Sequence, residues 1–411
     1  MNDISEGGEA AALRHAERLD KFVPTEARPV VLLKEQLEAR SAGLDAQTKA
    51  DIEAAHANIR GFADAQRASM QDFETSPAPG IVLGQKQVPV NSVGCYSPAG
   101  RFCHVASVLM TVATAKAAGV KNVTLCCPPY RSPGEDSPWV HPAQAYAALV
   151  SGADRVLCMG GVQAISCMAY GLFGAVPADV ICGPGNAFVA EAKALLAEKG
   201  VSGIDLFAGP TESGIIADET ANPEHVAIDL ISQAEHGPTS KTVLFALDRK
   251  LAEYVAKRAP ELAVDLGADS AAATSWRNVG EIILCDSREE AVRRSDEYAL
   301  EHMQVHTGDD DYFLQNMTAY GGLFCGPGNT VSLGDKCLGP NHTLPTMRAG
   351  RFTGGLTVSK LVRTVTWSRV TTEGAQTVAP LAARISRYEG MEGHARAADS
   401  RTESKTAAHA A

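Results

Sequence analysis

The chain has 411 residues, with 37 lysine and arginine residues against 48 aspartate and glutamate residues, so its formal net charge is −11. Apolar residues make up 45% of the chain and charged residues 21%, as in ordinary globular proteins, which excludes a disordered chain. A duplex-binding protein needs a basic surface, so nucleic acid is not an expected partner. The length allows two to four domains.

Ten cysteines are too few for the disulfide framework of a small secreted protein, and none of them forms a C-x-x-C motif. The polar N-terminus shows no secretory signal, so we expect reduced thiols and a cytoplasmic protein. The uncharged stretch Val156–Ala178 is long enough to span a membrane, but glycines and Pro177 interrupt it. A buried strand, turn and helix are expected there, and no membrane partner.

The predicted elements begin with helices over residues 8–75, the second of them over Asp45–Phe73, and end at the proline-rich segment Ser76–Gly80. Short apolar runs then alternate with helical patterns, as in repeated βαβ units. The predicted strands are Val90–Tyr96, Val123–Cys127, Arg155–Met159 and Asp179–Cys182, and the predicted helices are Val105–Ala118, His141–Gly152, Val162–Tyr170 and Ala187–Glu198.

A second unit of the same kind follows, and a last helical segment covers Gly374–Ala395 before a polar tail, from Ala397, that is predicted to be frayed. The sequence therefore predicts an α/β fold with two Rossmann-like, doubly wound parallel-sheet units in series and helical N- and C-terminal segments. The predicted domains are residues 1–80, 81–203, 204–345 and 346–411. In the second unit the extended segments are Asp205–Phe207, Gly214–Ala217, Thr242–Leu247, Val279–Cys285 and Met303–Thr307, and the helices are Pro223–His236, Leu251–Ala259 and Glu289–Leu300.

The helix Pro223–His236 has a good N-cap in Asn222, and Gly237 suits its C-terminal stop. Gln233 and His236 are spaced i, i+3, so they share a face at the last turn. An amide oxygen and a neutral imidazole there could hold a divalent metal. The alternative is a histidine that only complements the helix dipole.

Three further segments concentrate titratable residues. Glu301-His302 lies between a predicted helix and a strand, where the pair could act as a base and a water activator, or simply end a solvated helix. The loop Gly334–Thr346 is dense in turn residues and contains Asp335 and His342, as functional loops often do. The segment Glu389–His394 adds another glutamate and histidine, which alone predict nothing.

A dinucleotide fingerprint and a P-loop are both absent from the sequence. Gly183-Pro184-Gly185-Asn186 has two glycines but lacks the third of the G-x-G-x-x-G pattern. Any nucleotide site in this chain must therefore be atypical.

Taken together and in order, these segments resemble the histidinol dehydrogenase family over about residues 8–396. The resemblance implies an NAD-dependent oxidation of a primary alcohol to a carboxylate through an aldehyde, with two NAD consumed. It is carried by Ile204–Glu212, Ser232–Pro238, Leu300–His302, Pro340–Thr346, and Glu389 with His394.

The resemblance also implies the cofactor sites. Zinc, one ion per subunit, would be held by Gln233, His236, Asp335 and His394. NAD would contact Tyr96, Gln163 and Asn186, which lie at or just after predicted strand ends in the first α/β unit, where an open sheet binds its ligands.

The implied catalytic residues are His302, as the base that takes the hydroxyl proton, and Glu301, which activates water for the second oxidation. The family resemblance further implies a homodimer with intertwined subunits and shared active sites. His394, in the C-terminal segment, would then complete the zinc site of the partner subunit.

Thr343–Thr372 carries basic residues and no acidic one, in an otherwise acidic chain. Within it, Arg351–Val358, Lys360 and Thr364–Thr366 resemble the sulfopropanediol 3-dehydrogenase branch of the family, which implies oxidation of 2,3-dihydroxypropane-1-sulfonate to 3-sulfolactate. A sulfonate is a permanent anion and suits arginine donors, here Arg348 and Arg351. The alternative for this basic run is a solvated or subunit-facing surface.

Glu389 suits a cationic amine, so oxidation of L-histidinol to L-histidine stays an alternative. Thr211, Asn341 and His342 are expected substrate contacts under either reading. Two further alternatives are a zinc-dependent hydrolase with Glu301 as its base, and an inactive paralogue that only binds its ligand.

Overall fold

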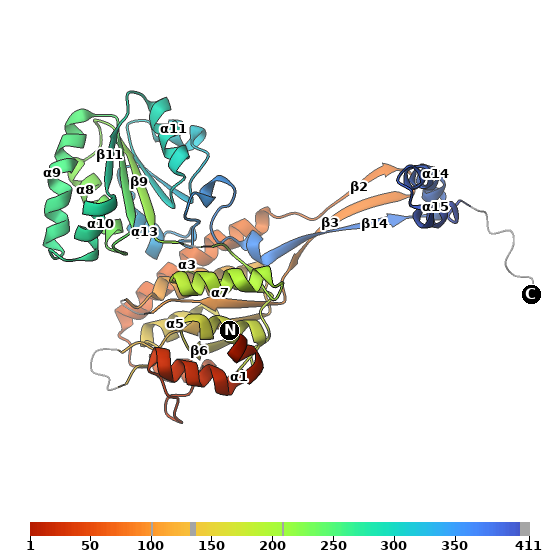
Figure 1. Ribbon diagram of the computed structural model, residues 1–411, viewed down its shortest axis with the longest axis horizontal. Coiled ribbons are helices and arrows are strands. Elements are labelled where there is room, and N and C mark those ends of the chain that lie inside the picture. The colour runs from red at the N-terminus through yellow and green to blue at the C-terminus, as the bar shows by residue number, and fades with distance from the viewer. Residues whose placement is uncertain (100–101, 132–136, 208, 403–411) are drawn as a thin grey trace, which may run out of the picture. The chain divides into compact units, whose positions relative to one another are not determined.

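The computed structural model describes residues 1–99, 102–131, 137–207 and 209–402 (Figure 1). Ala208, within the segment Ile204–Glu212, and residues 403–411 of the predicted frayed tail lie outside the described residues. The described residues form two compact units, one within residues 1–67 and 90–361 and the other within residues 68–89 and 362–402. The predicted division into four domains stays a prediction.

The first unit contains a six-stranded sheet that is parallel except at its edge strand β1 (Val31–Leu32). The chain adds strands in one direction and then reverses between β4 and β7, which is the doubly wound pattern. Helices cover the connections, and their bounds match the predicted ones closely. The strands in spatial order are β1, β6 (Arg155–Cys158), β5 (Asn122–Cys127), β4 (Ser92–Tyr96), β7 (Val180–Cys182) and β8 (Gly203–Ile204), and the helices are α4 (Val105–Ala118), α5 (Pro142–Ser151), α6 (Gly161–Tyr170) and α7 (Ala187–Glu198).

A second sheet in the same unit is parallel throughout and reverses between β9 and β12. Its strand order repeats that of the first sheet, so the predicted pair of doubly wound units is confirmed. The strands in spatial order are β11 (Glu281–Leu284), β10 (Lys241–Ala246), β9 (Glu212–Ala217), β12 (His302–His306) and β13 (Gly322–Cys325), and the helices are α8 (Pro223–Ala234), α9 (Arg249–Asp265), α10 (Ala271–Val279), α11 (Arg288–Tyr298), α12 (Asp310–Asn316) and α13 (Val331–Lys336).

The predicted N-terminal helices are present as α1 (Asn2–His15), α2 (Lys34–Ser41) and α3 (Ala46–Ser69), with a π-helical turn at Ala16–Asp20. Several details differ from the prediction. The helix predicted to reach Phe73 ends at Ser69, and no strand forms at Asp205–Phe207. The elements that were not predicted in these units are β1, β8, α10, α12, β13 and α13.

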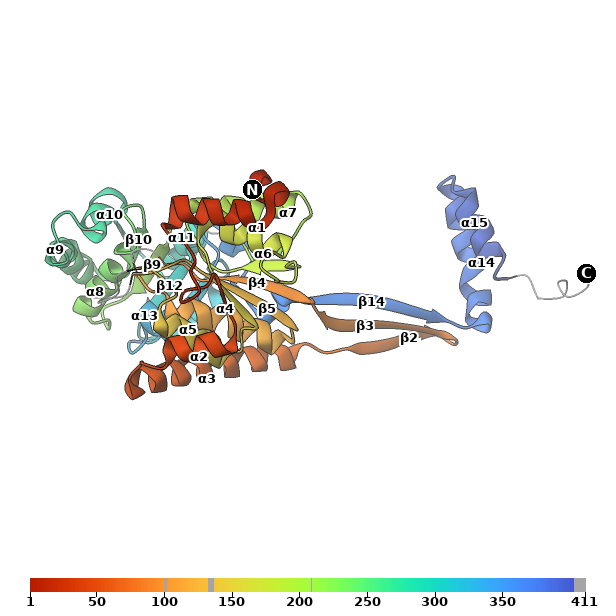
Figure 2. The ribbon, with the colours of Figure 1, turned by 90° about the horizontal axis from the view of Figure 1, so that it is seen from below.

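The second compact unit is an antiparallel sheet, β14 (Val362–Val370), β3 (Ile81–Pro89) and β2 (Phe73–Ala78), followed by α14 (Thr372–Tyr388) and α15 (Glu392–Asp399) (Figure 2). The sequence did not predict this sheet, because its strands are largely exposed and have no buried alternating face. The single predicted helix Gly374–Ala395 is broken at Gly390, whose φ of 77° a helix does not allow. The tail is helical as far as Asp399 and is not frayed from Ala397.

The uncharged stretch Val156–Ala178 forms β6 and α6, so the predicted strand, turn and helix are confirmed. Within the described ranges, no helix is both long and apolar enough to cross a membrane. The cytoplasmic location stays a prediction.

Candidate active site

Glu301 and His302 stand at the start of β12, where the chain leaves α11 through a left-handed residue, Ala299. Both are buried, with 8% and 3% of their surface exposed. The His302 Nδ1 lies 3.6 Å from Glu301 Oε2, and its Nε2 lies 3.6 Å from Asp335 Oδ1 on α13. The imidazole is therefore held between two carboxylates.

This arrangement sets the protonation of all three groups. Burial raises the pKa of Glu301 to about 7, against the opposing effect of His302. Burial works against a charged His302, but Glu301 and Asp335 outweigh it and raise the pKa of His302 to about 9. Burial also opposes the charge on Asp335, yet the nearby His302 outweighs it and lowers the pKa of Asp335 to about 2. Several perturbed pKa values within one buried cluster are typical of a catalytic site.

Gln233 lies in the last turn of α8, but the helix ends at Ala234, two residues before the predicted end at His236. The helix starts at Pro223 behind Asn222, whose Oδ1 accepts the N–H of Glu224 at 3.0 Å. His236, on the exposed turn that follows, is within electrostatic reach of Asp335 and His302. Two of the predicted ligands of the first unit, Asp335 and His236, therefore lie near His302, and Gln233 lies three residues before His236.

The amide of Gln233 fits a metal ligand. Its side chain is 2% exposed, and the Oε1 atom has no hydrogen-bond partner among the described residues. An unpaired buried acceptor costs about 1–3 kcal/mol, so the fold tolerates it only for a reason. A cation bound with Asp335 and His236 would satisfy this oxygen.

No three histidine, cysteine, aspartate or glutamate side chains converge as a metal cluster in the part of the chain that the structure describes. The predicted ligand set accounts for this. Gln233 is an amide, and His394 lies on α15 in the other compact unit, so only His236 and Asp335 of those residue types remain in the first. His394 and Glu389 are both exposed.

The predicted NAD residues lie at the reversal point of the first sheet. Tyr96 ends β4, and its buried hydroxyl accepts the N–H of Gly161 at 3.1 Å at the start of α6. Asn186 follows β7 and caps α7 through the N–H groups of Phe188 and Val189. The crevice at such a reversal, with helix N-termini beside it, suits the pyrophosphate of a dinucleotide.

Gln163, the third predicted NAD residue, is held by an aspartate that the sequence analysis missed. Asp20 Oδ2 accepts the Gln163 Nε2 at 2.9 Å and the N–H of Gly160 at 3.0 Å. Asp20 comes from the N-terminal helical segment, far away in the chain, and no local pattern marks it.

Asn341 and His342 connect the two sheets. The Asn341 Nδ2 donates to Met110 O at 2.8 Å on α4, and His342 Nε2 lies 3.1 Å from Ser107 Oγ on the same helix. His342 Nδ1 lies 3.0 Å from the backbone oxygen of Asp335. These contacts fix the segment that follows α13, the helix that carries Asp335, and the sequence did not predict this structural role for Asn341 and His342.

A cavity of about 300 Å³ is lined by Asp335, Asn341 and His342 and by Phe62 and Gln66 of α3. Neither of the two predicted arginines, at 348 and 351, is among the residues that line this cavity.

The loop that carries Arg348 and Arg351 is nevertheless tied to the catalytic pair. Met347 donates its N–H to the Glu212 carboxylate at 3.2 Å, and the N–H of Glu212 is donated to Glu301 Oε2 at 3.1 Å. Met347 and Arg348 both have positive φ, 55° and 64°, which costs energy in residues other than glycine. Thr211, the other predicted contact, directly precedes Glu212.

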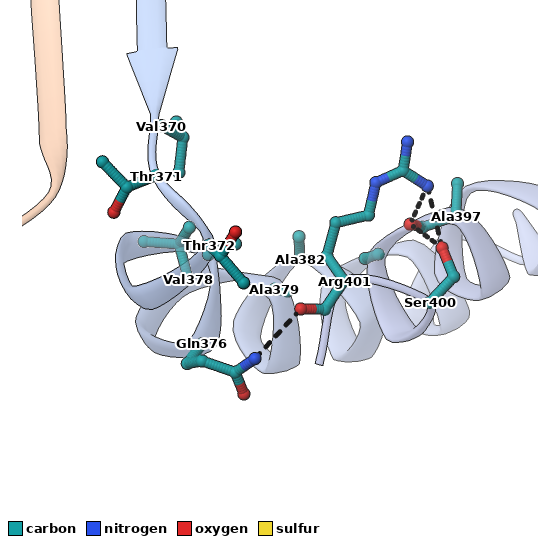
Figure 3. A pocket seen from close by; sticks show the side chains of 12 residues that line it. Val370, Thr371, Thr372, Gln376, Val378, Ala379, Ala382, Ala397, Ser400 and Arg401 are labelled. Atoms are coloured by element: carbon teal, nitrogen blue, oxygen red, sulfur yellow. Dashed lines mark hydrogen bonds between the residues drawn. The ribbon is translucent and has the colours of Figure 1, made fainter. Parts of the chain in front are cut away.

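The second compact unit has its own open groove, between α14 and α15 (Figure 3). There, Gln376 Nε2 donates to Arg401 O at 3.1 Å, and Arg401 reaches Ala397 O and Ser400. Neither Glu389 nor His394 lines the groove, and it carries no cluster of acids or histidines.

The sequence pattern of the histidinol dehydrogenase family matches residues 1–402. The chain belongs to the histidinol dehydrogenase family. It is therefore an NAD-dependent oxidoreductase that acts on CH–OH groups, as expected, and the hydrolase alternative has no support. NAD and zinc are the cofactors that the family generally uses, and its members are generally dimeric.

Relatives within the family differ in their names. The chain is 48% identical to a sulfopropanediol 3-dehydrogenase of Ruegeria pomeroyi, over 98% of this chain and 90% of that one. It is 51% identical to a histidinol dehydrogenase homolog of Pelagibacter ubique, over 90% and 86% of the two chains. The crystal structure of histidinol dehydrogenase from Elizabethkingia anophelis matches with a TM-score of 0.89 at 30% identity, over 97% and 90% of the two chains.

Proposed function

We propose that the protein oxidises a small polar primary alcohol to its carboxylate through the aldehyde, with two NAD per turnover, and that the alcohol is 2,3-dihydroxypropane-1-sulfonate. The observation that carries the reaction is the buried His302 between two carboxylates, and the unpaired amide oxygen of Gln233 supports a metal site. The 48% identity to a sulfopropanediol 3-dehydrogenase supports the substrate.

In this proposal the neutral form of His302 takes the hydroxyl proton of the alcohol, and its two carboxylate neighbours stabilise the imidazolium that forms. Glu301 is a base for the second step, in which water must attack the aldehyde. Its pKa of about 7 allows a carboxylate to accept a proton near neutral pH.

Gln233, His236 and Asp335, with the partner subunit's His394, would hold the zinc ion. When bound, zinc supplies Lewis acidity that makes the alcohol hydroxyl easier to deprotonate. Tyr96, Gln163 and Asn186 would orient NAD, which supplies the hydride acceptor.

The substrate would enter the cavity beside Asp335 and His342, whose volume suits a molecule of this size. The sulfonate would be recognised by Arg348 and Arg351 on the loop tied to Glu212 and Glu301. Glu389 favours the cationic L-histidinol as the second candidate, because its carboxylate would pair with an amine.

Steady-state kinetics with both alcohols decide the substrate. We expect kcat/KM to be higher with the sulfonate, and Arg351→Met to lower it through KM, while the exposed Arg249→Met on α9 serves as the matched control. Preference for L-histidinol, or equal behaviour of the two arginine variants, would contradict this assignment.

The proposed assembly is a homodimer. Helix α14 presents a stripe of large apolar side chains at 38–85% exposure, a larger apolar row than a lone subunit normally leaves in water. A second copy of the chain would cover them. The stripe consists of Val378, Leu381, Ile385 and Tyr388.

A further inference from the structure

A row of buried polar side chains leads away from the catalytic pair along β12. His302, Gln304 and His306 alternate along the strand and therefore point to one face of the sheet. They are 3%, 0% and 3% exposed. Both amide atoms of Gln304 and the Nε2 of His306 have no hydrogen-bond partner among the described residues. Buried polar atoms of this kind are usually bridged by ordered water.

The far end of the row meets α8. His306 Nε2 lies 3.7 Å from Asp229 Oδ2, and Thr330 Oγ1 donates to Asp229 Oδ1 at 3.0 Å. Asp229 is one helical turn before Gln233, so it shares the face of α8 that carries the predicted ligand. The catalytic pair and the Asp229–His306 pair thus occupy opposite ends of one buried polar row.

This far end opens to solvent. The side chain of Asp229 is 13% exposed, and His225, one turn earlier on α8, is exposed. The other charged groups facing His306 are Asp310 at the start of α12 and Asp218, which follows β9 and donates its N–H to the His306 carbonyl.

The proposed reaction makes such a route useful. Oxidation of R–CH₂OH with two NAD⁺ and one water gives R–COO⁻, two NADH and three protons. His302 is buried, so a proton that it takes must leave before it can act again.

We propose that Asp229 and His306 form a proton relay that carries protons from His302, through water held at Gln304, to solvent beside His225. His306 accepts a proton on one ring nitrogen and releases one from the other, and the Asp229 carboxylate stabilises the imidazolium in between. No bond other than O–H and N–H bonds changes. The relay rests on the proposed function, because only a proton-releasing reaction needs it.

The protonation of the pair suits this role. Burial raises the pKa of Asp229 to about 6, and burial lowers the pKa of His306 from its ordinary value despite the opposing charge of Asp310. The raised value brings the Asp229 carboxyl closer to neutral pH, and the lowered pKa of His306 favours release of a proton from its ring.

The test compares His306→Gln and Asp229→Asn with Thr242→Val in the zinc-loaded enzyme. Thr242 is a matched control, since its buried, unpaired hydroxyl belongs to β10 in the same sheet but lies outside the row. We expect kcat of both relay variants to fall about 10- to 100-fold at unchanged KM. Added 1,2-dimethylimidazole, a hindered base, should restore most of the kcat that the relay variants lose. Thr242→Val should keep the wild-type kcat and should not respond to the added base. Unchanged kcat, or a loss that the added base does not restore, would overturn the relay.

A second measurement needs no turnover. The ring resonances of His306, assigned by their loss in His306→Gln, should titrate about one pH unit lower in Asp229→Asn, because the variant loses the carboxylate that stabilises the imidazolium. An unchanged titration midpoint of His306 would overturn the pairing of His306 with Asp229. A wild-type enzyme that reduces NAD with neither alcohol would contradict the proposed function. The resonance titration would still test whether Asp229 pairs with His306.

Discussion

His302 and Glu301 show how two neighbouring residues acquire different tasks from their surroundings. The histidine has carboxylates on both sides, which favour its proton, whereas the glutamate is buried and loses most of its preference for charge. The sequence placed both residues at a junction of elements, but their partner Asp335 lies 33 positions further on and could be assigned only through the family resemblance.

Glu301→Gln is expected to slow oxidation of the aldehyde by about 100-fold and that of the alcohol much less, because the amide cannot accept a proton from water. Single-turnover NADH formation from each substrate measures the two steps separately. The assignment of Glu301 fails if aldehyde oxidation proceeds at the wild-type rate.

The raised pKa of His302 predicts a pH-dependent contribution to stability in the zinc-free protein. Its pKa rises from 6.5 to about 9 on folding, so the protonated ring stabilises the fold fully below pH 6.5, and this stabilisation is lost as the pH rises through about 9. His302→Gln should therefore lower the free energy of unfolding more at pH 7 than at pH 10. Urea denaturation at both pH values measures this difference, and a pH-independent cost would contradict it.

The bounds of a helix could be predicted closely where a capping residue or a glycine marks its end. Helix α4 ends at Gly119, which adopts φ of 90°, and α7 starts behind the capping Asn186, and both have the predicted bounds. Strands β2 and β14 could not be predicted, because neither buries an apolar face. The sequence of β12 is misleading in another way: its alternating polar residues look like a solvated face, yet the fold buries them.

Helix α8 offers a test in which two properties move in opposite directions. Gln233→Leu should abolish zinc binding but leave the zinc-free protein as stable as the wild type or more stable, because an apolar side chain replaces a buried, unpaired amide. Metal content by mass spectrometry and urea unfolding of the zinc-free forms measure both. A variant that keeps its zinc would remove Gln233 from the ligand set.

At the scale of the whole molecule, the chain divides its predicted site between two compact units. Gln233, His236 and Asp335 belong to one, and Glu389 and His394 to the other. Spacing along the chain cannot predict such a division, because it depends on the antiparallel sheet that the sequence did not reveal. A dimer with shared sites would allow an exposed histidine near the C-terminus, His394, to complete the proposed metal site.

Leu381→Glu with Ile385→Glu is expected to weaken the dimer, since two charges would enter the apolar stripe of α14. Light scattering after size-exclusion chromatography gives the mass, and Arg384→Glu, an exposed residue on the same helix, controls for charge alone. The same double variant should lose zinc in proportion to its monomer content if the partner subunit's His394 completes the site. A monomeric variant with full zinc content would contradict the shared site.

The number of NADH formed per molecule of alcohol tests the central claim most directly. With zinc-loaded enzyme, excess NAD and limiting 2,3-dihydroxypropane-1-sulfonate, the account predicts two NADH per alcohol and a carboxylate as the final product. One NADH per alcohol, with the aldehyde accumulating, would contradict the double oxidation assigned to His302 and Glu301.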